Sequence, residues 1–386
     1  MRRRQFLTGV AGAAGAAGMT LGSVAANPAQ AKARSSTGSS AASSTSSGWT
    51  EVAVPPASGS ARLESVAAQS ASRAWAVGSQ LRDEGDNPAA PLALVWDGTS
   101  WSETDTGHLG RNGGIRSVSS AGGDNAWAVS HGPDGGGQLL GWDGTTWQHT
   151  PYPDEGRPGG GLNAVLAVAG GEAWAVGSRG EGSEPALLRW NGSVWQWTDP
   201  LPAGVSPSLH GLNRALDGSV WVYGAEAVVR WDGGWTPVDF TPSIRSGITG
   251  LVPTAPDDVW LIGWAYGVGG PPGKPPAPVL SRYDGTGWSS PDKPFSPGAL
   301  TAITADGQGV PELLCGWDFW EQTSAHYACW EPAGSGSGAW VSERGPDAGT
   351  GSSVTQSALA AVPGTTGGYW SVGHLGDNTP RIERRS

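Results

Sequence analysis

Residues 75–101 read WAVGSQLRDEGDNPAAPLALVWDGTSW, and this stretch predicts the fold of most of the chain. It begins with an aromatic-aliphatic strand that ends in a glycine, residues 75–78, and it finishes with a Trp-Asp-Gly segment that a second tryptophan follows, residues 96–101. Asp-Gly between apolar runs is a strong hairpin signal, because type I′ turns need positive φ at both central residues. The stretch therefore predicts a strand, a loop and a second strand that turns back as a hairpin.

The same two elements recur about every 40 to 55 residues, a period typical of propellers and solenoids. Further copies of the first element begin at Trp127, Trp174, Trp221, Trp260 and Trp370, and a degenerate copy begins at Leu313. Further copies of the second element begin at Trp142, Trp190, Trp231 and Tyr283. An alternating run precedes each first element, so each repeat holds four short strands, the content of one propeller blade. We therefore expect an all-β fold, a single seven-bladed β-propeller over residues 48–386.

The last repeat, residues 354–386, holds one strand fewer than the others. The missing strand resembles residues 48–52, GWTEV, which match the strands that contain Trp101 and Trp147. We expect the strand around Trp49 to complete the last blade as its outermost strand. Such a closure removes an open sheet edge that would otherwise template aggregation.

Residues 1–31 have the layout of a cleavable export signal. Three arginines precede a weakly apolar run at residues 7–21, and residues 29–31, AQA, supply a small-residue cleavage site. Residues 3–7, RRQFL, resemble the twin-arginine motif, whose pathway carries folded cargo; a signal for unfolded export is the alternative. Residues 32–47, mostly Ser, Ala, Thr and Gly, are predicted to be a disordered linker. We therefore expect a secreted or otherwise extracytoplasmic protein without a membrane span.

Composition narrows the class of partner. The net charge is −11, and removal of the three signal arginines would leave −14. Such a surface repels phosphate backbones, so we do not expect a nucleic acid partner. The 22 tryptophans argue against disorder in spite of 63 glycines and 30 prolines, because disordered chains are poor in large aromatic residues. We expect a monomer.

The candidate binding residues are those outside the repeat pattern, because the repeated tryptophans should pack between blades. Loops after the second strands of a propeller gather at one face, and residues 317–321, WDFWE, place three aromatic residues beside two acids. Exposed aromatic residues beside carboxylates suit a sugar, an amine or a peptide. A loop folded back onto its own blade is the alternative. The candidate ligand-binding residues on this face are Trp264, Tyr266, Trp317, Asp318, Trp320, Glu321, His326 and His374.

Cys315 and Cys329 occupy the places that Val77 and Val95 hold in the first repeat, on neighbouring strands. An extracytoplasmic destination favours a disulfide between them, and two buried thiols are the alternative. The six histidines show no spacing typical of metal ligands, so the sequence predicts no metal site and names no cofactor. No nucleophile elbow or Walker loop is present, and nothing singles out a catalytic pair among the acids.

The repeats resemble two known families. A strand that ends in glycine, followed by Tyr/Trp-Asp-x-x-x-Trp, is similar to the kelch repeats of galactose-oxidase-like central domains, and residues 283–288 are the nearest copy. The second glycine typical of kelch is replaced in several copies, by Ser79, Ser178, Ala225 and Trp264. Residues 220–235 also resemble tectonin repeats, which belong to sugar-binding propellers. Both resemblances cover residues 48–386 and imply a fold rather than a function.

We therefore expect a secreted or cell-envelope propeller that binds a glycan, peptide or protein on its loop face. An extracytoplasmic hydrolase or lyase with its site at the channel mouth is one alternative, and a scaffold for envelope protein assembly is another. A concave pocket with a desolvated acid or converging histidines would favour the enzyme. A shallow aromatic patch with solvated acids would favour the binding protein.

Overall fold

The computed structural model describes most of the predicted propeller. The described residues are 48–57, 59–81, 89–110, 113–123, 125–131, 136–156, 160–179, 184–198, 200–202, 204–205, 209–225, 227–240, 246–266, 275–305, 311–331 and 338–386. The predicted export signal and linker, residues 1–47, lie outside this part of the chain. Among the described residues, no helix has the length and apolarity that a membrane crossing requires.

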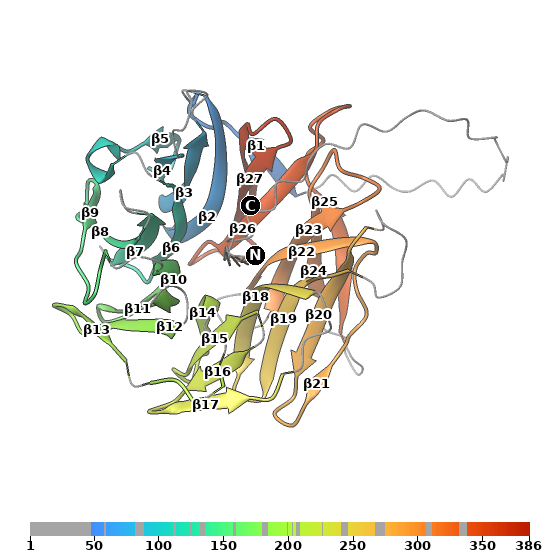
Figure 1. Cartoon of the computed structure of the whole chain (residues 1–386). Coiled ribbons are helices and arrows are strands. Elements are labelled where there is room, and N and C mark those ends of the chain that lie inside the picture. The colour runs from blue at the N-terminus through green and yellow to red at the C-terminus, as the bar shows by residue number, and fades with distance from the viewer. Residues whose placement is uncertain are drawn as a thin grey trace, which may run out of the picture. The chain divides into compact units, whose positions relative to one another are not determined.

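The described strands form seven antiparallel four-stranded sheets, which confirms the predicted propeller (Figure 1). Blade 1 consists of β2 (Ser60–Ser70), β3 (Arg73–Leu81), β4 (Ala90–Trp96) and β5 (Trp101–Glu103). Blade 2 consists of β6 (Ile115–Ser120), β7 (Ala126–His131), β8 (Gly137–Trp142) and β9 (Trp147–His149). Blade 3 consists of β10 (Gly161–Val168), β11 (Glu172–Arg179), β12 (Glu184–Trp190) and β13 (Trp195–Trp197). Blades 4 and 5 are β14 (Leu209–Arg214), β15 (Val220–Gly224), β16 (Val228–Trp231), β17 (Trp235–Val238); and β18 (Ser246–Ala255), β19 (Asp258–Ala265), β20 (Ala277–Tyr283), β21 (Trp288–Ser289). Blades 6 and 7 are β22 (Gly298–Ala305), β23 (Pro311–Asp318), β24 (His326–Glu331), β25 (Ala339–Arg344); and β26 (Val354–Ala361), β27 (Tyr369–Leu375), β28 (Pro380–Arg385), β1 (Trp49–Val52). A short 3₁₀ turn, Gly107–Leu109, follows blade 1.

The repeated tryptophans fill the spaces between blades, as predicted. Trp75 lies edge-on to Trp142 and Trp147 of the next blade, with ring centroids 5.7 and 6.4 Å away. The strand-two tryptophans of blades 2 to 5 and 7 are buried in the same way, and Leu313 takes this place in blade 6. The apolar clusters span neighbouring sheets. A large aromatic ring at this place buries about 150–250 Å² and dominates the energy of the contact.

The innermost strand of every blade carries a β-bulge at the same place, which explains the glycine of the repeat. The register skips Glu64 in β2, and the equivalent residues are Arg116, Asn163, His210, Thr249, Thr301 and Ser357. The bulge brings the innermost strand against the second strand. A Cβ added to Gly78, Gly263 or Gly373 would therefore collide with a carbonyl oxygen of the innermost strand. This close approach of two backbones is the reason for the Trp-x-x-Gly pattern.

The turns between third and fourth strands differ from the predicted two-residue type. Trp96 pairs with Trp101, so the loop has four residues, and Gly98 supplies the positive φ. Asp97 Oδ1 accepts hydrogen bonds from the backbone N–H groups of Thr99 and Ser100, each at 2.8 Å. These bonds, the one from Ser100 most of all, lower the pKa of Asp97 to about 2. The Asp-Gly signal predicts the hairpin correctly, but the aspartate closes the turn through its side chain.

The N-terminal strand closes the ring, as predicted. The strand order β1-β28-β27-β26 puts β1 at the outside of blade 7, with Trp49 opposite Arg385 and Val52 opposite Ile382. Trp49 also stacks on Tyr327 of blade 6, with ring centroids 3.8 Å apart and planes 9° from parallel. Figure 1 shows β1, at the blue end of the colour scale, beside the red strands of blade 7.

The predicted disulfide between Cys315 and Cys329 is absent from the structure. The register places Cys315 opposite Tyr327 and Cys329 opposite Leu313, so the two residues are diagonal neighbours and not a directly facing pair. Each sulfur has its own contact, Cys315 Sγ with Thr301 Oγ1 at 3.3 Å and Cys329 Sγ with Glu343 Oε2 at 3.8 Å. Burial raises the pKa of Cys315 to about 12, which keeps this thiol neutral.

Deleting residues 48–54 should destabilise the whole ring, because blade 7 then loses its outer strand and Tyr327 loses its stacked partner. Loss of a buried tryptophan alone costs about 3–5 kcal/mol, so we expect a clear drop in melting temperature and in the free energy of unfolding. Thermal and urea unfolding followed by tryptophan fluorescence measure both quantities. Thr50→Ala, whose side chain is exposed on the same strand, is the control and should leave both unchanged. An unchanged melting temperature in the deletion variant would disprove the closure assignment.

Candidate functional site

The structure brings some of the predicted binding residues together and separates others. Asp318, Trp320, Glu321 and His326 lie at one end of blade 6, where β23 ends and β24 begins. Trp264 and Tyr266 lie at the same end of blade 5, where β19 ends. His374 lies in blade 7 at the end of β27, where the charged group that acts on it is Arg62 of blade 1. The side chain of Trp317 lies outside the described part of the structure.

An arginine that the sequence did not reveal holds the loop of blade 6. Arg344 Nη2 lies 2.7 Å from Asp318 Oδ2 and 2.9 Å from Glu321 Oε2. Arg344 Nη1 donates to the backbone carbonyl of Glu321 at 3.2 Å, and the backbone N–H of Trp320 donates to Asp318 Oδ1 at 2.9 Å. Both loop acids are therefore already paired with a cation, whereas the sequence suggested that they point toward a ligand. Only the strand pairing could have placed Arg344 near these acids, because Arg344 of β25 lies opposite His326 of β24.

His326 is a neutral, buried part of this cluster. The residue is 5% exposed, and its ring stacks on Phe295 with centroids 4.2 Å apart. Burial first, and then the charge of Arg344, lower the pKa of His326 to about 4, although Asp318 Oδ2 lies 3.5 Å from Nδ1. The pKa of Asp318 is also lowered, because the Trp320 N–H and Arg344 outweigh the effect of burial. At neutral pH the cluster thus holds an ionised Asp318 and an uncharged His326.

Two aromatic pairs form a rim on this face, and we call Trp264, Tyr266, Phe319 and Trp320 the aromatic rim. Trp320 is 76% exposed and packs edge-on against Phe319 with ring centroids 4.9 Å apart. Tyr266 is 40% exposed and packs against Trp264 at 5.0 Å. Backbone hydrogen bonds connect the two loops, from Phe319 N–H to the carbonyl of Pro297 and from Gly298 N–H to the carbonyl of Pro276. The rim therefore presents exposed aromatic surface on a hydrogen-bonded framework.

The bulged residues of the innermost strands form a second polar group, around the axis of the ring. All seven are polar, and several tie neighbouring blades together. Asn163 Nδ2 donates to the carbonyl of Leu209 at 2.6 Å, and Thr249 Oγ1 donates to the carbonyl of Leu300 at 2.7 Å. Burial raises the pKa of Glu64, although Arg116 and Arg62 oppose the shift. The sequence could not reveal this ring, because a bulge shifts the strand pattern by one residue.

The histidines do not converge. Burial and then Arg62 lower the pKa of His374 to about 4, while His326 lies against Phe295 and Asp318. In the described part of the chain, no three side chains of His, Cys, Asp or Glu come close enough to hold a metal ion. What the aromatic rim offers chemically is stacking and apolar contact, beside two acids that are already paired with Arg344.

The chain matches no protein-family model and no curated protein. Its fold is similar to that of several solved structures. "YCF48 bound to D1 peptide" has a TM-score of 0.58 and 16% identity over 88% of this chain and 96% of that chain. A virginiamycin B lyase from Staphylococcus aureus, a catalytically inactive variant with quinupristin, has a TM-score of 0.57 and 13% identity over 87% of this chain and 98% of that one. The extracellular domain of a hybrid two-component system, BT4673 from B. thetaiotaomicron, has a TM-score of 0.56 and 11% identity over 88% of this chain, but only 40% of that longer chain. At these identities the likeness shows the propeller fold alone, and it supports neither kelch nor tectonin membership.

Stability should fall between pH 6.5 and pH 4, in part because of His326. Its pKa is about 4 in the folded protein against an ordinary value of about 6.5. The unfolded chain therefore binds the proton first as the pH falls, and stability is lost across this window, by on the order of 2–3 kcal/mol. His326→Phe keeps a ring against Phe295 and cannot titrate. The free energy of unfolding of this variant should therefore fall less between pH 7 and pH 4.5 than that of the wild type. Urea unfolding at the two pH values measures this difference.

The control for this experiment is Trp320→Ala, in the loop that precedes β24, which should show the wild-type pH dependence. Equal losses of stability in the wild type and in His326→Phe would contradict the assignment of a depressed histidine pKa.

Proposed function

We propose that this protein is an exported binding propeller that engages a peptide or protein segment through the aromatic rim. The observation that carries the proposal is Trp320, a large aromatic side chain that is 76% exposed at the end of a loop fixed by Asp318, Arg344 and Glu321. A tryptophan held in place before binding loses little conformational freedom when a partner covers it. Tryptophan and tyrosine are enriched among the residues that contribute most to protein interfaces.

The charges at the rim favour a peptide or protein over a strongly ionic ligand. Asp318 and Glu321 share Arg344, so the loop presents one net negative charge and no unpaired cation. The surface left for a partner is mainly the rings of Trp320 and Tyr266. Exposed aromatic faces fit apolar side chains or the flat face of a sugar ring, and a glycan is the other ligand class that the experiment below includes.

Binding is favoured over catalysis because neither Asp318 nor His326, the buried acid and histidine of the loop, is suited to proton transfer near neutral pH. Asp318 stays ionised and His326 stays uncharged, whereas general acids and bases work best with a pKa close to the pH of the reaction. Glu64, at the axis, has the raised pKa that an enzyme site would use. Its charged neighbours are two arginines, and no second carboxylate or titrating histidine accompanies it among its described interactions.

Trp320→Ala should weaken binding at least about tenfold, as expected for an interface anchor, without changing the melting temperature. The probes are an immobilised library of peptides from cell-envelope proteins and an array of glycans, and the strongest hit is then measured by calorimetry. Val341→Ala, which removes another exposed apolar side chain on β25, is the matched control and should bind as the wild type does.

Retained binding in Trp320→Ala, or no binding to either array by the wild type, would contradict the role of the rim. A large fall in melting temperature would show that Trp320 has a structural role.

Export by the twin-arginine route is the second part of the proposal, and it rests on residues 3–7. Replacing Arg3 and Arg4 together with lysine keeps the charge and removes the arginine pair that the pathway requires. We expect the double variant to stay in the cytoplasm as an uncleaved precursor, and cell fractionation with immunoblotting measures its distribution. A matched change of Arg2 to lysine should leave export intact. Normal export of the double variant would show that a different pathway carries the protein.

A further inference from the structure

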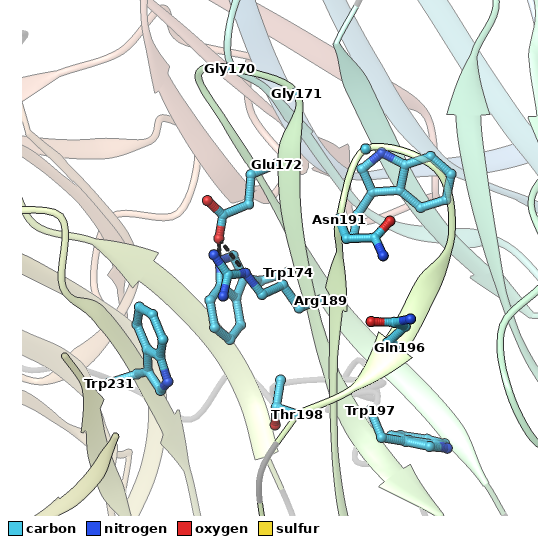
Figure 2. A pocket seen from close by; sticks show the side chains of 12 residues that line it. Gly170, Gly171, Glu172, Trp174, Arg189, Asn191, Gln196, Trp197, Thr198 and Trp231 are labelled. Carbon is cyan, nitrogen blue, oxygen red and sulfur yellow. Dashed lines mark hydrogen bonds and ion pairs between the residues drawn. The ribbon is translucent and has the colours of Figure 1, made fainter. Parts of the chain in front are cut away.

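A cleft between blades 3 and 4 is unconnected with the rim and lies at the opposite end of the blades. Its walls are formed by the beginning of β11, by the turn after β12 and by β13, and its volume is about 530 Å³. Figure 2 shows its two sides. The side chains of Asn191 and Gln196 lie on one side, and the indole of Trp231 from blade 4 lies on the other, with Arg189 between them.

Arg189 is held in a defined position within this cleft. Its Nε donates to Glu172 Oε1 at 2.8 Å, and the same oxygen accepts the indole N–H of Trp174 at 2.8 Å. The guanidinium carbon lies 5.1 Å from the ring centroid of Trp174 and 5.2 Å from that of Trp231. Among the described residues, no group accepts a hydrogen bond from the two terminal nitrogens of Arg189. The cleft therefore presents the terminal N–H donors of a held guanidinium beside a carboxylate whose contacts with the described residues use only Oε1.

Blade packing alone does not require this arginine. The register places an equivalent residue opposite the strand-two tryptophan or leucine in every blade, and in blades 1, 2 and 6 it is Val95, Gly141 and Cys329. Those blades contact their neighbours without an arginine there. In blades 4, 5 and 7 the equivalent residue is also an arginine, namely Arg230, Arg282 and Arg384. Arg282 Nε lies 2.6 Å from Asp258 Oδ1, and its guanidinium lies 5.2 Å from the ring centroid of Trp260. The guanidinium of Arg384 lies 5.0 Å from the ring centroid of Trp370 and 5.6 Å from that of Trp96.

The chemistry of the cleft fits a neutral sugar. Two adjacent hydroxyl groups accept hydrogen bonds from a guanidinium fork and donate to a neighbouring carboxylate, so one diol satisfies both partners. An anion would match the fork but would be repelled by Glu172 and by the overall charge of −11. The amide of Gln196 is exposed and has polar atoms for further hydroxyl groups. Trp231 supplies the aromatic surface that the apolar face of a sugar ring contacts.

We propose that the cleft between blades 3 and 4 is a saccharide-binding site. Arg189 and Glu172 hold a vicinal diol, Gln196 contacts a further hydroxyl group, and Trp231 packs against the ring. This site is independent of the proposed function of the aromatic rim.

The experiment follows the indole N–H signal of Trp231 by ¹⁵N NMR during titration. The probes are methyl α-mannopyranoside, methyl β-galactopyranoside, methyl α-fucopyranoside and N-acetylglucosamine, with sodium sulfate as the anionic probe. We expect at least one sugar to shift this signal. Arg189→Lys should weaken the affinity for that sugar about tenfold or more, because lysine keeps the charge but loses the guanidinium fork. Gln196→Ala, an exposed position whose change should not affect folding, should also weaken it. Arg282→Lys makes the same change in blade 5 and is the matched control, which should respond as the wild type does.

Three results would overturn the proposal. The first is no shift with any of the four sugars, and the second is an undiminished response in both Arg189→Lys and Gln196→Ala. The third is a response to sulfate at lower concentration than to any sugar, which would make the cleft an anion site.

Discussion

The structure depends on the seam where the chain closes the ring. Glu383 and Arg381, on the strand that receives β1, are 0% and 2% exposed, and Arg381 Nε lies 2.5 Å from Glu383 Oε1. Tyr327 of blade 6 donates to Glu383 Oε2 at 2.8 Å, and Arg381 Nη1 lies 2.7 Å from Glu51 of β1. Because removing one partner of such a buried pair costs about 3–5 kcal/mol, these contacts hold the last two blades and the first strand together.

The other blade interfaces also contain apolar clusters of one repeated geometry, and hydrogen bonds from the inner strands join some of them. The seam is therefore local, but its effect reaches the whole ring. The bulge and the glycine of the second strand fix how close the inner strands lie in each blade. The tryptophan three residues before that glycine, a leucine in blade 6, fills the space to the next blade. A ring with seven such interfaces leaves no open edge only when the last blade is complete. Residues outside this framework, such as Trp320 and Arg189, are then available for binding.

The sequence predicts the framework well because the framework repeats. Seven copies of one pattern identify the strands, the hairpins and the missing strand that Trp49 supplies. Side-chain partners that depend on register are harder to foresee. Arg344 lies 26 residues from Asp318 and 23 from Glu321, the two loop acids with which it pairs. Cys329 lies opposite Leu313, which separates it from Cys315. The polar ring and the cleft at Arg189 were also missed, because a bulge and a contact between blades leave no local signal.

Hydrogen–deuterium exchange of the intact protein, read by mass spectrometry, tests most directly the claim that the first strand closes the ring. If β1 is an integral strand of blade 7, the amides of residues 49–52 that bond to β28 exchange only when the ring opens, as slowly as those in the centre of β27. Exchange of residues 49–52 on the time scale of an unstructured peptide, while β27 and β28 stay protected, would contradict the account. The protein would then be a ring that is stable without its seam.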